Sequence, residues 1–403
     1  MKINNLLFYV YLSAIFSIFI PIAVYPIFFL IFIYFNTLSI LSEKKILIIN
    51  NLFILNIMII LFILIASFSF FSNLSNSDHI QYLKIIINFI FLINVGYYID
   101  SNTHIFLAKR KIFQNIFELI IILSFIQIII NVHSVNFWLI PFIGVENSVM
   151  AYKIVEAPIL FGTTEKNIWA TKIAFIQIIY FSFIYFKYFN VKNIKLYIFW
   201  LLSIFNIVYT FSRTAQLVFL LFITAFIIWK IFYIYKKILL KILSISFFLL
   251  ISIPILFVIY DKLFHITLGS GDGMSARLEL WEALYINLNN MNIYTGNGIL
   301  YAKYVISTFT SWTNNNFHNV FLNTFADEGI IGLLLYILIL RMVFFSYKLN
   351  KVSKRFIFLV LFLPFFACIN SQYLGYDSDI VIYFSLVLLI SKYLQFNNKV
   401  VSK

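Results

Sequence analysis

The chain alternates long apolar runs with short polar interruptions along its whole length. A helix that crosses a bilayer needs about 20 consecutive, mostly apolar residues, and many segments here meet that requirement. We predict twelve such helices, at about residues 5–20, 22–41, 46–71, 81–99, 112–131, 168–186, 196–211, 214–235, 238–260, 329–346, 356–374 and 379–396. The pattern therefore predicts an all-α, polytopic membrane protein in which residues 1–403 form a single transmembrane domain.

Two polar interruptions are much longer than the others and lie at about 132–167 and 261–325. The second lacks the apolar pattern for roughly 60 residues, and loops of this length within a compact protein are usually functional. Within it, residues 275–288 carry apolar positions at helical spacing, which predicts a short helix on the membrane surface. We expect the two loops to cover an active site.

Composition and charge support this class of protein and exclude others. The chain of 403 residues is 63% hydrophobic and only 11% charged, whereas soluble domains carry about 25% charged residues. The net charge of +14 would suit a nucleic-acid partner, but the basic residues cluster between apolar runs, as membrane topology requires, so we expect none. With a cytoplasmic N-terminus, most basic residues lie inside, and both long loops face the extracytoplasmic side.

Two arginines stand out on that outer side. Arg213 lies between two apolar runs with almost no loop, which predicts a tight helical hairpin. An arginine at membrane depth costs at least about 2.5–3.5 kcal/mol, so Arg213 either snorkels to the interface or binds an anion such as phosphate. Arg277 lies on the predicted surface helix, where it either pairs with Glu279 or Glu282 or binds an anion.

His318 precedes the apolar run that begins near Gly329. An imidazole can act as a general base near neutral pH, although a single histidine is more often structural or simply solvated. Gly296-Asn297-Gly298 could form any turn. The chain has no His, Cys or Asp spacing typical of a metal site and no nucleotide-binding motif, so we expect no metal and no cofactor.

Four short motifs, in this order, resemble the O-antigen polymerase and O-antigen ligase family of bacterial membrane glycosyltransferases. They are Gly162 to Asn167 followed by Ala170, Ser212-Arg213-Thr214, Ser275-Ala276-Arg277 with Trp281 and then Gly296-Asn297-Gly298, and His318-Asn319 followed by Gly329 and Gly332. The first motif lacks the proline that often precedes the asparagine. The resemblance covers about residues 160–345, and the earlier helices match only in hydropathy.

The resemblance implies a GT-C-like fold and a metal-independent glycosyl transfer from an undecaprenyl-pyrophosphate-linked oligosaccharide. Arg213 and Arg277 would bind the pyrophosphate, and His318 would either deprotonate the acceptor hydroxyl or hold the pyrophosphate. Asn319, Gly296, Gly298 and Asn167 would complete the substrate site. The expected location is the bacterial inner membrane, with the site facing the periplasm or cell exterior and a chain-length regulator as a candidate partner.

Three functions remain in competition. A polymerase would transfer the glycan to another lipid-linked repeat unit and is the function we favour, whereas a ligase would transfer it to lipid A–core. A flippase or other transporter is the rival from a different class, and it would need ionisable residues buried along a membrane pathway. Within the apolar runs only Glu118 is a candidate for such a residue.

Overall fold

The protein is described by a computed structural model, whose described residues form helices and their connections and include no strand. The described residues are 2–20, 24–42, 52–74, 77–134, 166–210, 212–234, 274–310, 316–370 and 375–401. The helices that cross or line the bundle are α1 (Lys2–Ser17), α2 (Tyr25–Ser42), α3 (Phe53–Ser72), α4 (His79–Ser101), α5 (Thr103–Ala108), α6 (Arg110–Ser134), α9 (Lys166–Tyr185), α10 (Asn193–Val208), α11 (Arg213–Ile234), α15 (Val320–Phe345), α16 (Lys351–Phe356), the π-helical segment η2 (Ile357–Phe362), α17 (Leu363–Ile369) and α18 (Ser378–Val401).

The predicted class, an all-α polytopic membrane protein, is confirmed. Among the described residues, nine helical stretches are long and apolar enough to cross a membrane, and α1 and α10 are shorter apolar helices. These helices account for every predicted apolar run except 238–260, which lies outside the described residues, so the count of twelve stays a prediction. The predicted hairpin at Arg213 is present, because α10 ends at Val208 and α11 begins at Arg213.

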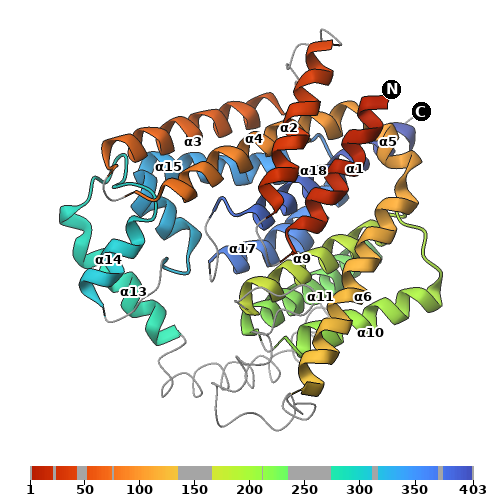
Figure 1. The fold of residues 1–403 in the computed structure, drawn as a ribbon. Coiled ribbons are helices and arrows are strands. Elements are labelled where there is room, and N and C mark those ends of the chain that lie inside the picture. The colour runs from red at the N-terminus through yellow and green to blue at the C-terminus, as the bar shows by residue number, and fades with distance from the viewer. Residues whose placement is uncertain are drawn as a thin grey trace.

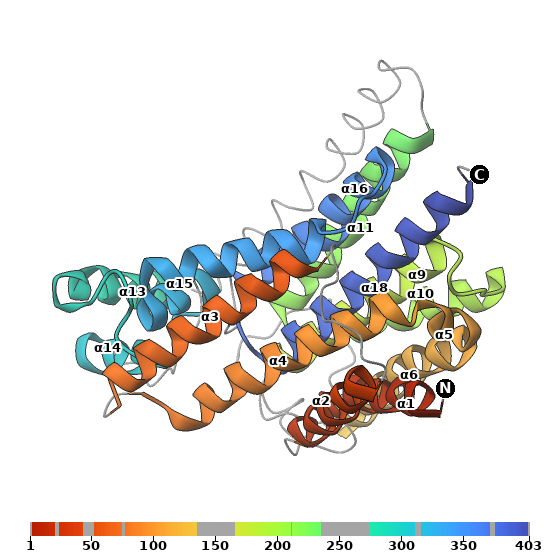
Figure 2. The same ribbon diagram turned by 90° about the horizontal axis from the view of Figure 1, so that it is seen from above.

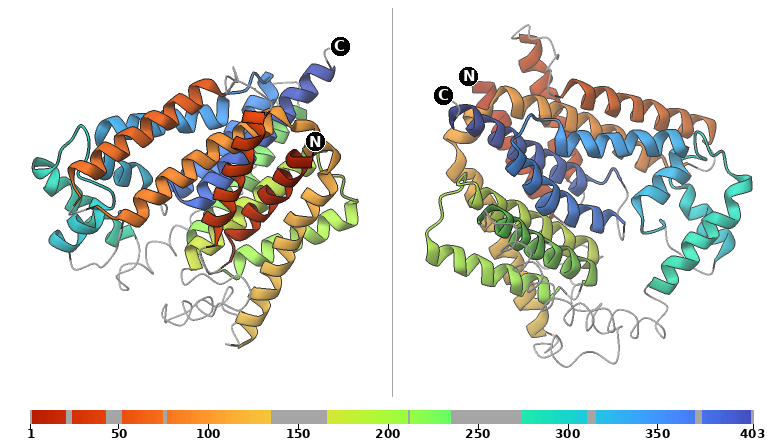
Figure 3. Two further views of the ribbon diagram at one scale, coloured as in Figure 1. Left: turned by 45° about the horizontal axis from the view of Figure 1, so that its top comes forward. Right: turned by 180° about the vertical axis from the view of Figure 1, so that it is seen from behind.

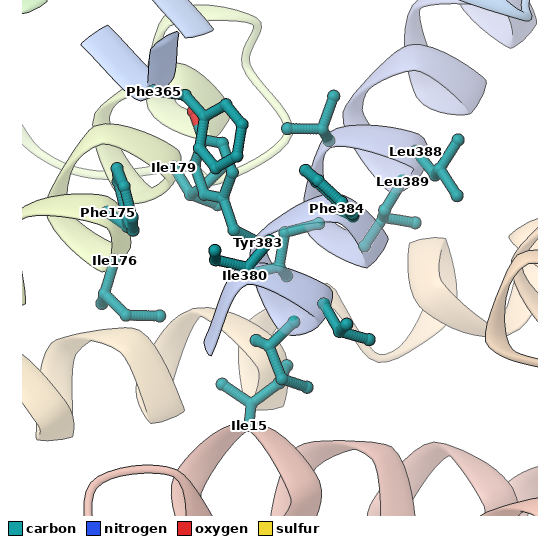
Figure 4. Packing of buried hydrophobic residues seen from close by; sticks show 14 of the residues in the cluster. Ile15, Phe175, Ile176, Ile179, Phe365, Ile380, Tyr383, Phe384, Leu388 and Leu389 are labelled. Carbon is teal, nitrogen blue, oxygen red and sulfur yellow. The ribbon is translucent and has the colours of Figure 1, made fainter. Parts of the chain in front are cut away.

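Helix α18 forms the centre of the bundle, and nearly all of its apolar positions are buried. Its Tyr383 ring packs against Phe175 of α9 and Phe365 of α17, with ring centroids 4.6 and 5.2 Å apart (Figure 4). By contrast, α2 and α3 expose large apolar side chains, for example Tyr34 and Leu64. A helix that is apolar on every face suits a position between protein and lipid.

The two chain termini lie at one end of the molecule, and a small helical module lies at the other end (Figures 1 and 3). This module, which we call the outer module, consists of α13 (Met274–Ile286), the 3₁₀-helix η1 (Asn287–Asn290), α14 (Tyr301–Phe309) and the first turns of α15. It has its own apolar core, which includes Leu280, Val305 and Phe317. Sequence analysis predicted a helix on the membrane surface at 275–288; α13 confirms the helix, and its position on the membrane surface stays a prediction.

The outer module occupies most of the predicted loop 261–325. Residues 261–273 and 311–315 of that loop lie outside the described residues, as do residues 135–165 of the other predicted loop. Helix α15 begins at Val320, nine residues before the predicted run, because Asn319 caps it. A kink at Gly329, with φ 70° and ψ −170°, separates its first turns from the membrane-spanning part, and the predicted start at residue 329 coincides with this kink.

Candidate functional site

His318 lies within the outer module, in the short segment that directly precedes α15. Its backbone is in the left-handed region, with φ 51°, which is uncommon for a residue other than glycine and requires support from its surroundings. Its N–H donates to Oδ1 of Asn316 at 2.9 Å. The neighbouring Phe317 is fully buried in the core of the outer module. The segment is therefore held in one conformation by contacts on both sides.

Two side chains hold this segment against the helices. The Nε1–H of Trp281 on α13 donates to the carbonyl of Phe317 at 2.9 Å. The N–H of Phe317 donates to Oδ1 of Asn323 on α15 at 2.9 Å. Because residues four apart lie on one face of a helix, Trp281 also turns Arg277 toward the segment that carries His318.

Arg277 lies close enough to His318 for its charge to act on the imidazole. Burial, and in second place the positive charge of Arg277, lower the pKa of His318 to about 4. Both effects disfavour the imidazolium form, so His318 is a neutral imidazole at neutral pH. A neutral imidazole can accept a proton from a hydroxyl group, and the adjacent guanidinium can bind an anionic leaving group.

Asn319 has a clear structural task. Its side chain accepts from the N–H groups of Phe321 and Leu322 at 2.9 and 3.1 Å, and so caps α15. Its Nδ2 donates to Oδ1 of Asn370, at the end of α17, at 3.4 Å. These contacts join the His318 segment to the membrane bundle, and contact between Asn319 and substrate stays a prediction.

Gly296 and Gly298 lie against the kink in α15. Both have positive φ, 73° and 102°, and their N–H groups donate to the carbonyls of Asn292 and Asp327 at 2.9 and 3.2 Å. A Cβ at Gly296 would overlap the carbonyl group of Asp327, and one at Gly329 would overlap the backbone of Tyr294. The glycines thus allow two backbone segments to approach closely, which is sufficient reason for glycine at these positions without any substrate contact.

Sequence analysis missed two acidic residues at this kink. Asp327 and Glu328 are 1% and 0% exposed. The Oδ1 atom of Asp327 accepts from the N–H of Tyr301 at 3.0 Å and so caps α14, whereas neither carboxyl oxygen of Glu328 has a hydrogen-bond partner among the described residues. The available signal was the Asp-Glu-Gly sequence at the start of an apolar run.

Arg213 is the first residue of α11, and its side chain is exposed. The hairpin before it is fixed by buried hydroxyl groups: Thr210 Oγ1 donates to the carbonyl of Ile207 at 2.8 Å, and Ser212 Oγ accepts from the N–H of Ala215 at 3.4 Å. Arg213 is not among the groups that shift the pKa of His318. Helix α11 packs on α9 and α17, so α17 supports both the Arg213 helix and, through Asn370, the His318 segment.

Asn167 lies in the first turn of α9, which also packs on α11 and α18. Its carbonyl accepts from Oγ1 of Thr171 at 2.9 Å. The part of the first motif that precedes Lys166 lies outside the described residues. A convergence of Asn167 and Arg213 with His318 and Arg277 in one cavity therefore remains a prediction.

Glu118 forms a buried ion pair. It is 6% exposed, and its carboxylate accepts from Gln114 at 2.7 Å, from Tyr180 at 3.0 Å and from Lys195 at 2.6 Å. Three helices, α6, α9 and α10, meet at this group. Because its partners satisfy both oxygens, Glu118 has a structural explanation and gives the transporter hypothesis little support.

No group of three or more His, Cys, Asp or Glu residues within the described parts of the chain is arranged to hold a metal ion. The available chemistry is thus that of a neutral imidazole, a guanidinium group and the buried carboxyl groups behind them. These groups belong to a helical module at one end of a polytopic membrane bundle (Figure 2). This is the class of protein that the fold and the candidate site define: a multi-pass membrane protein with polar, ionisable groups at one membrane surface.

Comparison with known families narrows this class of protein to a family. Residues 198–337 match the family model described as O-antigen ligase, and this match supports the O-antigen ligase and polymerase family for the protein. No curated protein matches the sequence. The matched range contains Arg213, Arg277 and His318, and it excludes Asn167. The match supports the resemblance drawn from the motifs, and members of this family are glycosyltransferase-like membrane enzymes.

Proposed function

We propose that the protein polymerises a surface polysaccharide such as O-antigen, using undecaprenyl-pyrophosphate-linked oligosaccharide as donor and another lipid-linked repeat unit as acceptor. The observation that carries this proposal is the neutral His318 imidazole beside Arg277, within the range that matches the O-antigen ligase family. An acceptor hydroxyl needs a proton acceptor, and an anionic leaving group needs a cation; the pair supplies one of each.

In the proposed reaction, the acceptor hydroxyl oxygen forms a bond to the anomeric carbon of the donor glycan. The bond between that carbon and the pyrophosphate oxygen breaks, and the lipid pyrophosphate leaves with the bonding electrons. His318 takes the hydroxyl proton. Arg277 binds the pyrophosphate and stabilises the negative charge that develops on the leaving oxygen. Arg213, on the rim of its hairpin, is proposed as a second ligand of the pyrophosphate.

The bound donor changes the protonation of His318 in a predictable direction. A pyrophosphate close to the imidazole offsets the charge of Arg277, so the pKa of His318 rises from about 4 when the donor binds. An imidazole that becomes more basic only in the complex is a weak proton acceptor in the free protein and a better one when substrate is present. This change in pKa favours a role for His318 as the base that deprotonates the acceptor hydroxyl, rather than as a permanently charged ligand of the pyrophosphate.

A ligase is the second candidate, because the matching family model is described as O-antigen ligase. The two reactions share the donor and differ only in the acceptor. We favour the polymerase because the chain is very hydrophobic and has modest loops between most of its helices. The acceptor therefore has to be tested directly, and neither reaction is proposed to need a metal or a cofactor.

The test uses the purified full-length protein with lipid-pyrophosphate oligosaccharide in EDTA, and offers either lipid-linked repeat units or lipid A–core as acceptor. A ladder of lipid-linked polymer is expected with the first acceptor. Transfer to lipid A–core alone would replace polymerase by ligase. Activity that returns only with Mn²⁺ or Mg²⁺ would contradict a metal-independent mechanism, and no transfer to either acceptor by folded protein would contradict both.

Variants assign the roles of the side chains. Ala at Arg213 or Arg277 should abolish long products, and Lys should restore them only in part because it lacks the guanidinium fork. His318→Asn is the suitable imidazole variant, since Asn tolerates a positive φ. Lys303→Ala, on the exposed face of α14 in the same module, removes a cation and serves as the matched control. If the control loses as much activity as the Arg277 variant, the arginine has no specific role.

A further inference from the structure

A second set of cations lies on α16, which is found at the end of the molecule opposite the outer module (Figure 2), and these cations line a groove. The groove has a volume of about 430 Å³ and is lined by Phe232 of α11, Phe345 of α15, Lys354 and Arg355 of α16, and Phe358 and Leu359 of η2. Its walls are apolar apart from the two basic side chains. Neither the proposed glycosyl transfer nor the sequence motifs assign any task to this groove.

The groove lies where one helix changes its winding. Helix α16 continues into the π-helical segment η2, in which the N–H of Leu363 donates to the carbonyl of Phe358, five residues earlier. The next residue, Pro364, has no N–H with which to continue the ordinary α-helical pattern. Single π-helical turns occur frequently at functional sites, and here the wider turn presents Phe358 and Leu359 to the groove.

Two amphipathic aromatic side chains pack beside the groove. Trp229 of α11 packs edge-on against Phe356 with ring centroids 5.1 Å apart, and its Nε1–H donates to the carbonyl of Val352 at 3.3 Å. Tyr185 of α9 stacks on the same Phe356 ring at 5.9 Å. Tryptophan and tyrosine concentrate at membrane–water interfaces, where the ring is apolar and one end is wet.

The chemistry of the walls identifies the occupant. Phe232, Phe345 and Phe358 are each more than a third exposed, so they offer apolar surface to acyl chains. Lys354 and Arg355 are also exposed, and neither forms an ion pair with an acidic residue of the described chain. Two cations above an apolar wall match a phosphate group attached to hydrocarbon chains, and basic pockets between membrane helices on the cytoplasmic side bind anionic head groups.

We propose that this groove binds an anionic phospholipid, with the headgroup phosphate between Lys354 and Arg355 and the acyl chains along the three phenylalanines. The site is independent of the proposed glycosyl transfer. A bound lipid would join α11 to α15 and α16, because each of these helices contributes to the wall. An anionic headgroup is favoured over a zwitterionic one, whose ammonium group the two cations would repel.

The test measures lipid binding to the full-length protein in detergent, by retention in native mass spectrometry and by the change in thermal unfolding. Phosphatidylglycerol and phosphatidylcholine with the same acyl chains are the two probes, and the wild type should prefer the first. In the double variant Lys354→Gln/Arg355→Gln, affinity for phosphatidylglycerol should fall roughly thirty-fold, since each basic residue near an anionic surface contributes about fivefold.

The matched control is Lys348→Gln/Lys351→Gln, which removes two charges from the adjoining connection without touching the groove wall. It should retain most of the affinity. Leu359→Trp fills the groove and keeps both cations, so it should also weaken binding. Equal losses in the control and the groove variant, equal binding of the two lipids, or unchanged binding in Leu359→Trp would each overturn the site. Thermal unfolding without added lipid verifies that every variant is folded.

Discussion

The pKa of His318 makes the stability of the protein depend on pH in a defined window. The folded protein resists protonation of His318 until the pH falls to about 4, whereas the unfolded chain protonates it at the ordinary value of 6.5. Between these values the unfolded state binds more protons, so stability decreases as the pH falls from 6.5 to 4 and is unaffected by His318 above 6.5. The full contribution is roughly 3 kcal/mol, at about 1.36 kcal/mol for each pKa unit.

Two measurements check this reasoning. Thermal unfolding of the purified protein between pH 4 and 7 should depend on pH more steeply in the wild type than in His318→Asn, which has no imidazole to protonate. Diethylpyrocarbonate modifies only neutral imidazole, so its rate at His318, followed by mass spectrometry of the peptide, gives the pKa directly. Arg277→Gln should raise that pKa, although burial, the larger cause, should keep it below 6.5. A pKa of 6.5 or more in the wild type would refute the buried, Arg277-adjacent placement of His318.

Three further predictions concern topology and the kink in α15. Labelling of single cysteines should place residues 132–167 and 261–325 on the extracytoplasmic side and Lys351 on the cytoplasmic side. Labelling of position 351 from the extracytoplasmic side would contradict the predicted topology and the extracytoplasmic location of the site. Gly296→Ala should cost at least about 1–3 kcal/mol of stability, because it combines a positive φ with an overlap at the Asp327 carbonyl. Gly96→Ala is the milder control, since its Cβ would meet only two leucine side chains, at 3.2 and 3.7 Å. Glu328→Gln should unfold no more easily than the wild type at pH 7, since the amide keeps the size of a buried carboxyl group that has no hydrogen-bond partner among the described residues. A marked loss of stability would show that the carboxyl group is required.

The membrane helices could be predicted from the sequence because hydropathy is a local property. In a bilayer every backbone polar group must be satisfied within its own helix, so an apolar run of sufficient length already specifies a helix. This explains why the described helices follow the predicted runs closely. The main difference, the start of α15 at Val320, arises because the cap at Asn319 depends on side-chain hydrogen bonds rather than on hydropathy.

The proximity of Arg277 and His318 could be expected only in outline. Helical spacing predicted the α13 helix, and the family resemblance implied that Arg277 and His318 belong to one site. The contact that brings them together is the hydrogen bond from Trp281 to the Phe317 carbonyl, between residues 36 positions apart. Sequence analysis included Trp281 in a family motif but gave it no part in orienting His318.

The buried acidic residues show why the rest of the site was beyond prediction. A local pattern indicates that Asp327 and Glu328 are exposed, because charged residues at a helix entry are usually solvated. In the fold, the kink at Gly329 lets residues 292–298 run along the first turns of α15, and the N–H of Tyr301 then reaches the carboxylate of Asp327. Ser69 of α3 donates to the Asp327 carbonyl from 258 positions away in the sequence. The outer module is thus positioned by contacts that no local pattern contains, and the His318 segment, which continues directly into these turns of α15, depends on the same contacts for its place above the membrane.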